Sequence, residues 1–422
     1  MASRTKISKT ETSGSLQQAV EEGLAGLFVI FLERQIAKRL KDQLENPPKT
    51  LARKIADHVL SKSDDPFVWK GRSLGKDFHL AIDASDLELA MNEFERFRED
   101  KLPDLISGMA ENASQRILRS LKSRWTEEER QQELDLAGFR DRLHERWSEP
   151  LGKLRMLITM VREWCGEVHA RQNLKRKNQS GRANKLLIRL LTRALQVSDE
   201  ILCLLQNGFA DGAMARWRTL HEIAVVAAVI RLHGDEIAER YIAHQHVESK
   251  RSMTKYLESA PRLGYRSLSQ RVQKRIQKSY EKVIAAYGDD FKTDYGWAAA
   301  HLKKKRPTFA DLETSAGRAE MRSHYQMGND NIHAGVKSMY VRLGLMGNYD
   351  ALLSGRSNVG LTEPGQNAAH TLTQLAVIAC STEPTVDDNV ISMMLLKLRD
   401  EIPRCFGSVE TRIQRDEKAL KG

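Results

Sequence analysis

The sequence contains few cysteines, and they are spread singly along the chain. There are four in 422 residues, and no two of them form a CxxC pair. A zinc knuckle and a dithiol redox motif are therefore excluded, and we expect neither a metal ion nor another cofactor. Three of the four lie in apolar, helix-like stretches, where they are typical of small buried residues in a reducing compartment. The cysteines are Cys165, Cys203, Cys380 and Cys405.

Long hydrophobic runs are also lacking. The longest early apolar run, Leu24–Leu32, has nine residues, which is too few to span a bilayer. The acidic pair Glu21 and Glu22 precedes this run and argues against a signal peptide. The sequence therefore predicts a soluble cytoplasmic protein without a membrane span. We expect the run to belong to a core helix; a dimerisation helix and a membrane-surface helix are the alternatives.

Sustained strand alternation, internal repeats and glycine-rich phosphate loops are absent. A doubly wound, nucleotide-binding enzyme is therefore excluded, and apolar residues at helical spacing predict an all-α protein with a C-terminal helical bundle. Pro150 marks the expected boundary between two helical regions, and a capping box, Thr126-x-x-Glu129, predicts a helix start before it. The predicted parts are a disordered N-terminus (1–15), an N-terminal helical region (16–148), a helical bundle domain (149–400) and a polar C-terminal tail (401–422).

Acidic residues are scarce in two tracts of this basic chain, whose formal net charge is +11. Residues 171–193 hold eight basic and no acidic residues, and residues 250–282 hold ten basic and two acidic residues. Such an excess favours polyanionic partners, above all nucleic acid, although solvated helix faces are the alternative interpretation. Few aromatic residues interrupt the tracts, which argues against a base-stacking platform. The predicted nucleic-acid-binding residues are Arg171, Lys175, Arg176, Lys177 and Arg182, together with Lys303, Lys304 and Lys305 in a later cluster.

One stretch, residues 214–230, is nearly all apolar yet carries charges: MARWRTLHEIAVVAAVI. A helix that is apolar all round is usually buried, so its charged residues must be paired or hydrogen-bonded. Arg218 and Glu222 are four residues apart and share one helix face. Either they form a buried ion pair that fixes the packing of the bundle, or Glu222 orients Arg218 towards an anionic ligand such as a phosphate.

His221 follows Arg216 with four residues between them. This is the R-x4-H pattern of HEPN ribonucleases, in which a His and an Arg act on the RNA phosphodiester. A His of near-neutral pKa can move the 2′-hydroxyl proton, and an Arg stabilises the extra phosphate charge. The two residues lie about 140° apart on an ideal helix, however, so they would converge only if the helix were distorted or began between them.

His333 belongs to a second polar group, Asn329-Asp-Asn-Ile-His333, at a predicted helix start. In the functional interpretation His333 meets Arg218 and Glu222 across the bundle. The alternatives are a helix cap with a hydrogen-bonded core His, and a metal site of two His and a carboxylate, which no close ligand spacing supports. Arg240, Tyr241 and His244, one helix later, would complete the pocket.

Residues of about 151–383 resemble a family of bacterial proteins known as domain of unknown function 5677. The motifs that carry the resemblance are Arg218-Thr-Leu-His-Glu222, Arg240-Tyr241-Ile-Ala-His244, Tyr295-Gly-Trp297, Asn329-Asp-Asn-Ile-His333 and Ser354-Gly-Arg-Ser-Asn-Val-Gly-Leu361. Two positions depart from the family pattern: Asn329 stands where a Ser is expected, and His221 where an apolar or aromatic residue is expected. The resemblance implies a HEPN-like helical bundle, and such bundles often serve as RNA-cutting effectors in toxin and anti-phage systems.

The leading hypothesis is a nucleic-acid-acting protein, with RNA favoured over DNA, that is a metal-independent ribonuclease of a defence or toxin system. Glu222 would orient Arg218, Arg218 would bind phosphate, and His333 would be the acid or base; His221, Arg240 and His244 are the further candidates. The rival hypothesis is a non-catalytic interaction protein that binds nucleic acid or a protein partner, for example one from a defence operon. A third is an oligomeric scaffold, for example a homodimer, built through the Leu24–Leu32 helix.

Overall fold

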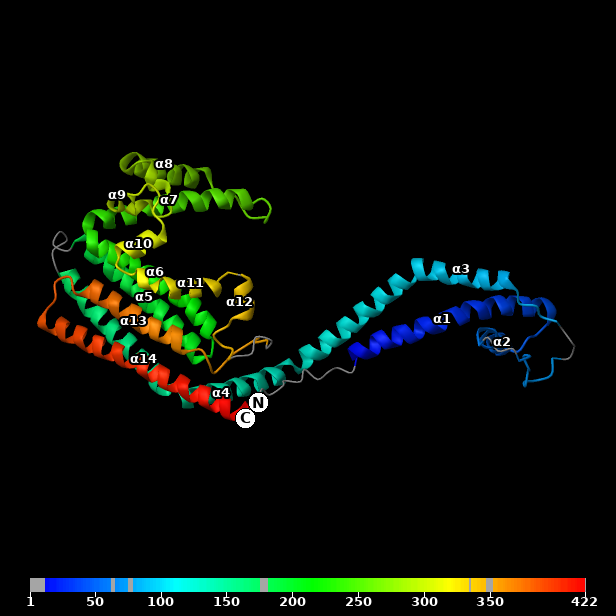
Figure 1. The fold of residues 1–422 in the computed structure, drawn as a ribbon. Helices are drawn as coiled ribbons and strands as arrows, with labels where there is room; N and C mark the ends of the chain where they lie inside the picture. The colour runs from blue at the N-terminus through cyan, green and yellow to red at the C-terminus, as the bar shows by residue number, and fades with distance from the viewer. Residues whose placement is uncertain are drawn as a thin grey trace. The chain divides into compact units, whose positions relative to one another are not determined.

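The computed structural model describes residues 12–61, 65–74, 79–174, 181–333, 335–346 and 352–421. Over these residues the secondary structure is helical and contains no strand (Figure 1), which confirms the predicted all-α fold. The chain divides into two compact units, residues 1–131 and residues 132–422. Most of the N-terminus that is predicted to be disordered, 1–15, lies outside the described residues.

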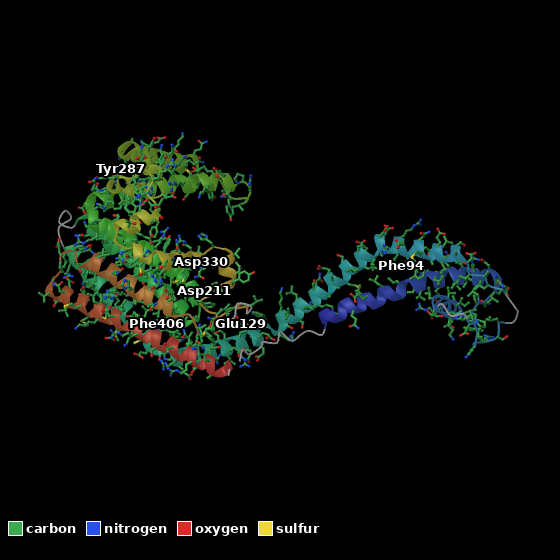
Figure 2. The ribbon with its side chains drawn as sticks, in the orientation of Figure 1. Phe94, Glu129, Asp211, Tyr287, Asp330 and Phe406 are labelled. Carbon is green, nitrogen blue, oxygen red and sulfur yellow. The ribbon has the colours of Figure 1, made fainter. Side chains whose placement is uncertain are left out.

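The first unit has a small core of its own. Phe31, at the end of the Leu24–Leu32 run, is buried together with Ile55 and Ala90 from the two following helices. Phe94, labelled in Figure 2, lies on the third helix of this unit. It packs edge-on against Phe31, with ring centroids 6.0 Å apart. The end of the apolar run is therefore part of a core. The helices are α1 (Thr12–Gln43), α2 (Leu51–Leu60), α3 (Ala84–Asp100) and the start of α4 (Leu102–Leu174).

The second unit is a bundle around one buried helix, α6 (Ala210–His233), which packs against α5, α11 and α13. Its hydrophobic core includes Trp147, Trp164, Trp217 and Phe406, all at most 1% exposed. These large rings come from three helices far apart in the sequence, so burying them fixes how those helices pack. The other long helices of the bundle are α5 (Arg182–Gln206), α13 (Thr362–Cys380) and α14 (Val386–Lys421).

A helical hairpin and several short helices follow α6 in the chain. The hairpin consists of α7 (Asp235–Ser259) and α8 (Gln270–Tyr287), which pack side by side (Figure 1). Gly234 and Gly288 have φ of 77° and 84°, a left-handed conformation that ends α6 and α8. The short helices are η1 (Asp289–Lys292), η2 (Gly296–Ala298), α9 (Ala299–Leu302), α10 (Phe309–Ser315), η3 (Ala319–Met321), α11 (Arg322–Asp330) and α12 (Val336–Tyr340).

Two predicted features of the N-terminal half are wrong: no helix begins at Thr126, and none ends at Pro150. Both residues lie inside α4, which runs unbroken through them. A proline inside a helix costs about 3 kcal/mol because it removes a hydrogen bond. Here Pro150 is buried, and so are Trp147 and Leu151 beside it. Burial of such side chains is worth about 1.5–3 kcal/mol each, enough to offset that cost. The division between the units falls at Gln131, before the expected boundary.

The C-terminal segment 401–422, predicted to be a polar tail, is mostly the second half of α14. Phe406, Val409 and Ile413 are buried, at the i, i+3, i+7 spacing of a single helix face. The prediction gave too much weight to the polar residues between them, which occupy the exposed faces of the helix. This end of the chain therefore contributes to the core of the second unit.

Asp388 links the start of α14 to α4. Its carboxylate, 2% exposed, accepts hydrogen bonds from Trp164 Nε1 (2.7 Å) and Arg171 Nη2 (2.5 Å). The backbone N–H and hydroxyl of Thr385 also donate to it, at 2.8 and 2.9 Å. Burial alone would raise the pKa of Asp388, but these hydrogen bonds outweigh it and hold the pKa well below the usual range. Arg171 is thereby paired within the fold while its side chain is 39% exposed, and its role as a nucleic-acid contact stays a prediction.

We expect Asp388→Asn to lower the free energy of unfolding by roughly 2–3 kcal/mol at pH 7, because Arg171 loses its counter-charge. The pKa of Asp388 is depressed on folding, so this stabilisation is present above the unfolded value of 3.8 and is lost as pH falls below it. The difference between wild type and variant should therefore shrink below about pH 4. Urea unfolding followed by tryptophan fluorescence measures both quantities.

The matched control is Asp387→Asn, because Asp387 is the exposed neighbour in the same turn. Its effect should stay within about 0.5 kcal/mol. Equal effects of the two substitutions would show that Asp388 makes no special contribution.

Candidate functional site

The charged residues of α6 point to different neighbours. Arg216 forms an ion pair with Glu200 on α5 and a hydrogen bond with Thr219. His221, on another face, lies against Glu313 of α10. The two residues of the R-x4-H pattern therefore do not converge on one site, as their angular separation on the helix predicts.

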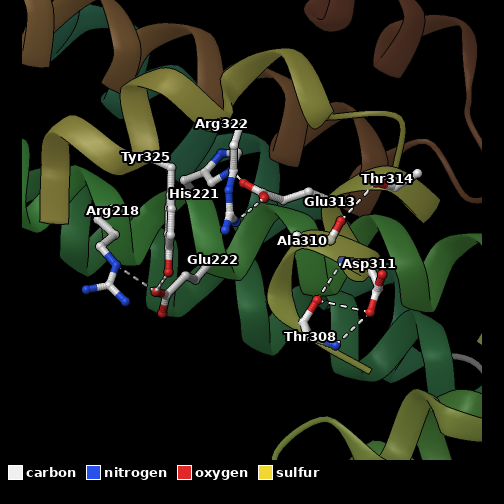
Figure 3. Close-up of polar contacts among 10 residues, drawn as sticks. All are labelled: Arg218, His221, Glu222, Thr308, Ala310, Asp311, Glu313, Thr314, Arg322 and Tyr325. Atoms are coloured by element: carbon white, nitrogen blue, oxygen red, sulfur yellow. Dashed lines mark hydrogen bonds and ion pairs between the residues drawn. The ribbon is translucent and has the colours of Figure 1, made fainter. Parts of the chain in front are cut away.

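Arg218 and Glu222 form the predicted pair on one face of α6. Arg218 Nε lies 3.1 Å from Glu222 Oε1, and their side chains are 22% and 37% exposed. Tyr325 of α11 donates a hydrogen bond from its hydroxyl to the same Glu222 oxygen, at 2.8 Å (Figure 3). The guanidinium also lies over the ring of Tyr325, 4.8 Å from its centroid. The Arg218 guanidinium is thus held at its Nε edge by Glu222 and on one face by the ring of Tyr325.

Tyr325 reaches Glu222 because α11 approaches α6 very closely. Gly328, one turn after Tyr325 on the same helix, is buried against α6. A Cβ atom at position 328 would lie only 3.3 Å from Arg218 Cβ. Burial raises the pKa of Tyr325 well above its usual range, and the hydrogen bond to Glu222 adds to this effect. The phenol therefore remains a protonated donor at neutral pH.

Within the described part of the chain the terminal amino groups of Arg218 form no ion pair, while its Nε lies 3.1 Å from Glu222 Oε1 without the alignment of a hydrogen bond. Figure 3 draws the interaction with Glu222 at Nε and none at the two terminal amino groups. An arginine has five N–H donors in a planar fork, so several of them are left for a ligand. The side chain is partly exposed, which makes these donors accessible from solvent. The arrangement can bind an oxyanion in two-point fashion.

His221 belongs to a buried cluster beside this pair. Its Nε2 lies 3.0 Å from Glu313 Oε1, and both side chains are 1% exposed. Glu313 Oε2 accepts a hydrogen bond from Arg322 Nη1 at 2.6 Å (Figure 3). Burial lowers the pKa of His221, and the opposing effect of Glu313 does not compensate. Rings of Trp217, Phe309 and Tyr325 surround the imidazole. His221 therefore has a packing role and does not face solvent, unlike the catalytic residue that was predicted.

Arg240 and His244 hold the helical hairpin to the segment after it. Arg240 Nε donates to the Trp297 carbonyl at 2.9 Å, and its guanidinium lies over the ring of Tyr287. His244 Nε2 lies 2.9 Å from the Thr293 carbonyl. Both side chains are buried. Among the described residues neither contacts the Arg218–Glu222 pair, so they do not complete a pocket with it.

His333 is not brought to the Arg218–Glu222 pair. It is exposed in the turn after α11, and its side chain makes no hydrogen bond or ion pair with either residue in the described structure. The sequence predicts a helix beyond residue 330. In the structure α11 ends at that residue, and only the short, mostly exposed α12 follows. Tyr325, which the prediction missed, is the residue of α11 that completes the site.

The other predicted nucleic-acid contacts differ in their surroundings. Arg182 is exposed and pairs with Glu239 at 2.9 Å. Lys304 pairs with Asp311 at 2.5 Å, whereas Lys303 and Lys305 are exposed and have no ion pair in the described part of the chain. Residues 175–180, which contain the predicted contacts Lys175, Arg176 and Lys177, lie outside the described residues.

The basic tract 250–282 forms the end of α7, the turn after it and most of α8. Of its ten basic residues, only Arg251 has an ion-pair partner within the described chain, Asp294 at 2.5 Å. The other nine are exposed or half-buried. The α7–α8 hairpin, defined as residues 235–287, therefore carries a concentration of uncompensated positive charge.

Comparison with known proteins identifies one family. Residues 184–350, which contain α6, α11 and His333, match the model described as "Family of unknown function (DUF5677)". The match confirms the family resemblance over a shorter range than the predicted 151–383. No curated protein and no solved structure matches the chain. Within the described residues, no cluster of His, Cys, Asp and Glu has the arrangement of a metal site, and no helix is long and apolar enough to cross a membrane.

We expect Glu313→Ala to lower the free energy of unfolding by about 3 kcal/mol or more. The substitution leaves a buried imidazole without its hydrogen-bond partner and removes the counter-charge of Arg322. Urea unfolding at pH 7 measures the loss. Gln326→Ala, at an exposed position on α11, serves as the control and should cost less than about 0.5 kcal/mol. If both variants unfold alike, the His221–Glu313–Arg322 cluster does not stabilise the bundle.

Proposed function

We propose that this protein binds nucleic acid, RNA in preference to DNA, and that Arg218 contacts a backbone phosphate. One observation carries the proposal: Arg218 is oriented by Glu222 and Tyr325 while the outer edge of its guanidinium has no partner in the described structure. The preference for RNA rests on the family resemblance, because HEPN-like bundles often act on RNA.

The geometry around Arg218 suits a phosphate. Glu222 approaches Nε, the ring of Tyr325 covers one face, and the two terminal amino groups remain for ligand oxygens. A guanidinium fork matches two oxygens of a phosphate, and its charge does not depend on pH in the physiological range. Because the side chain is already ordered, less conformational entropy is lost when the phosphate binds.

The α7–α8 hairpin supports the same function at longer range. Nine of the ten basic residues in its tract 250–282 have no ion-pair partner in the described chain. An uncompensated positive surface attracts a polyanion and raises the rate of association at low salt. The exposed Lys303 and Lys305 add to the charge of this part of the chain.

Cleavage of RNA is the second candidate function, and the family resemblance is what favours it. The described contacts supply a phosphate-binding cation but no accessible imidazole beside it, since His221 is enclosed and His333 does not contact Arg218 or Glu222. Binding is therefore the function that the geometry supports better. A role in defence, a protein partner and a homodimer stay predictions.

The binding proposal predicts that Arg218→Ala weakens the affinity for a fluorescent single-stranded RNA about ten- to a hundredfold, because a charged hydrogen bond is worth about 1.5–3 kcal/mol. A plot of the logarithm of the association constant against the logarithm of the salt concentration has a negative slope. Its magnitude should decrease by about one, as expected when one phosphate contact is lost. Fluorescence anisotropy over a salt series measures both. Arg218→Lys should give an intermediate affinity, because it keeps the charge and loses the fork.

Arg231→Ala is the control. Arg231 is exposed on the same helix, 13 residues and roughly 20 Å further along, and its loss should change affinity by less than about threefold. If Arg218→Ala lowers the melting temperature while the folded fraction binds RNA as tightly as wild type, Arg218 only locks the bundle and the proposal is wrong.

The ribonuclease hypothesis predicts that purified protein shortens mixed RNA in the presence of EDTA and that His333→Ala does not. Since His333 is exposed and separate from Arg218, we expect equal behaviour of the variant and wild type on a denaturing gel. Equal cleavage would remove His333 as the acid or base, and the absence of cleavage in both would leave RNA binding as the function.

A further inference from the structure

Arg318 is a buried cation without a counter-charge. It follows the turn after α10 and is 8% exposed. Its Nη1 donates to the side-chain oxygen of Gln374 on α13, and its buried Nε makes no hydrogen bond. No carboxylate lies within 4.0 Å of its guanidinium in the described part of the chain. By contrast, Arg171 and Arg322 are each paired with a buried carboxylate.

Such an arrangement is costly. Removing a guanidinium from water is compensated only when an opposite charge and hydrogen bonds replace the solvent. Burial lowers the pKa of Arg318, which reflects the same cost, yet an arginine stays charged at neutral pH. The exposed Glu320 is the charge that opposes this effect, and it forms no ion pair with Arg318. The site therefore lacks an anion.

The neighbouring side chains present further donors in a fixed arrangement. A guanidinium can only donate, so the oxygen of Gln374 faces Arg318 and the amide nitrogen faces His370. That nitrogen lies 2.7 Å from His370 Nε2. It can donate only to an unprotonated ring nitrogen, so the proton of the neutral imidazole is on Nδ1. His370 thus presents an N–H donor at Nδ1, for which the described structure contains no acceptor.

Burial and four nearby charges act on the imidazole of His370. Burial lowers the pKa of His370, and the charges of Arg399 and Arg318 lower it further. Glu320 and Asp400 act in the opposite direction but do not outweigh these effects. Asp400 is mainly exposed and pairs with Arg399. The named charges around His370 therefore balance, two arginines against two carboxylates, and burial is what keeps the imidazole neutral.

We propose that Arg318, His370 and Gln374 form a binding site for a small oxyanion, either inorganic phosphate or the terminal phosphate of a nucleotide. The anion would supply the counter-charge that Arg318 lacks and an acceptor for the Nδ1–H of His370. His370 and Gln374 are half-buried, and Gln374 contacts the buried Arg318 directly. The site does not depend on the contact proposed for Arg218.

The test is thermal unfolding of the full chain in phosphate and in chloride at matched ionic strength. Wild type should be stabilised by phosphate, with the melting temperature rising by roughly 2–4 °C once the concentration is several times the Kd. Arg318→Met should melt at or above the wild-type temperature without phosphate, because the unpaired charge is gone, and should lose the response. His370→Gln should fold like wild type and respond more weakly.

Arg356→Met is the matched control, because Arg356 is half-buried and bonded to Asn207 with no role in this site. It should keep the full response to phosphate. An equal rise in wild type, Arg318→Met and the control would show a general salt effect and overturn the proposal. So would an Arg318→Met variant that is destabilised yet still responds, because Arg318 would then be only structural.

Two further ligands distinguish the sources of the oxyanion. A nucleoside 5′-monophosphate and a short RNA without terminal phosphates are compared in the same assay. Stabilisation of wild type, but not Arg318→Met, by the monophosphate or by inorganic phosphate supports the site. Stabilisation by the unphosphorylated RNA alone would overturn it. Because the RNA-binding test uses Arg218→Ala, failure of one proposal leaves the other intact.

Discussion

The second unit depends on the burial of α6. Because this helix is buried, its charged side chains need partners in neighbouring helices to replace water. Two of them are compensated by neighbouring helices: Arg216 by Glu200 of α5, and His221 by Glu313 of α10. These contacts are directional, unlike apolar packing, so they fix which face of α6 meets which helix. Whether they add net stability over an apolar core is a separate matter, because desolvation opposes the attraction between the charges.

Arginines of this unit fall into two groups by what compensates them. In the first, a carboxylate is within reach, as for Arg171 and Arg322. In the second, compensation is partial: Arg218 keeps unpaired donors near solvent, and Arg318 is buried with no carboxylate within 4.0 Å among the described residues. Arg240 is equally buried and also lacks a carboxylate within that distance among them, but its Nε donates to the Trp297 carbonyl. The Nε atoms of Arg218 and Arg318 form no hydrogen bond in the described chain, so an anionic ligand would gain the most at these two arginines.

The sequence was sufficient for features that depend on local spacing. Apolar periodicity gave the all-α class, and the four-residue spacing gave the contact between Arg218 and Glu222. Features that depend on tertiary packing were missed. Tyr325 lies 103 residues from Glu222, and no local pattern relates them. Pro150 was misjudged for the same reason, because the packing that offsets its cost is contributed largely by residues distant in sequence.

Gly328 allows α6 and α11 to pack closely, because it has no side chain at their contact. With 3.3 Å between its hypothetical Cβ and Arg218 Cβ, one added methyl group would act as a wedge. It would move Tyr325 as a rigid body with its helix, while the spacing of Arg218 and Glu222 along α6 would stay unchanged. The size of the side chain at position 328 therefore sets how closely Tyr325 approaches Arg218. A substitution there would change how well the Arg218 guanidinium is held in place, without altering any group that would touch a ligand.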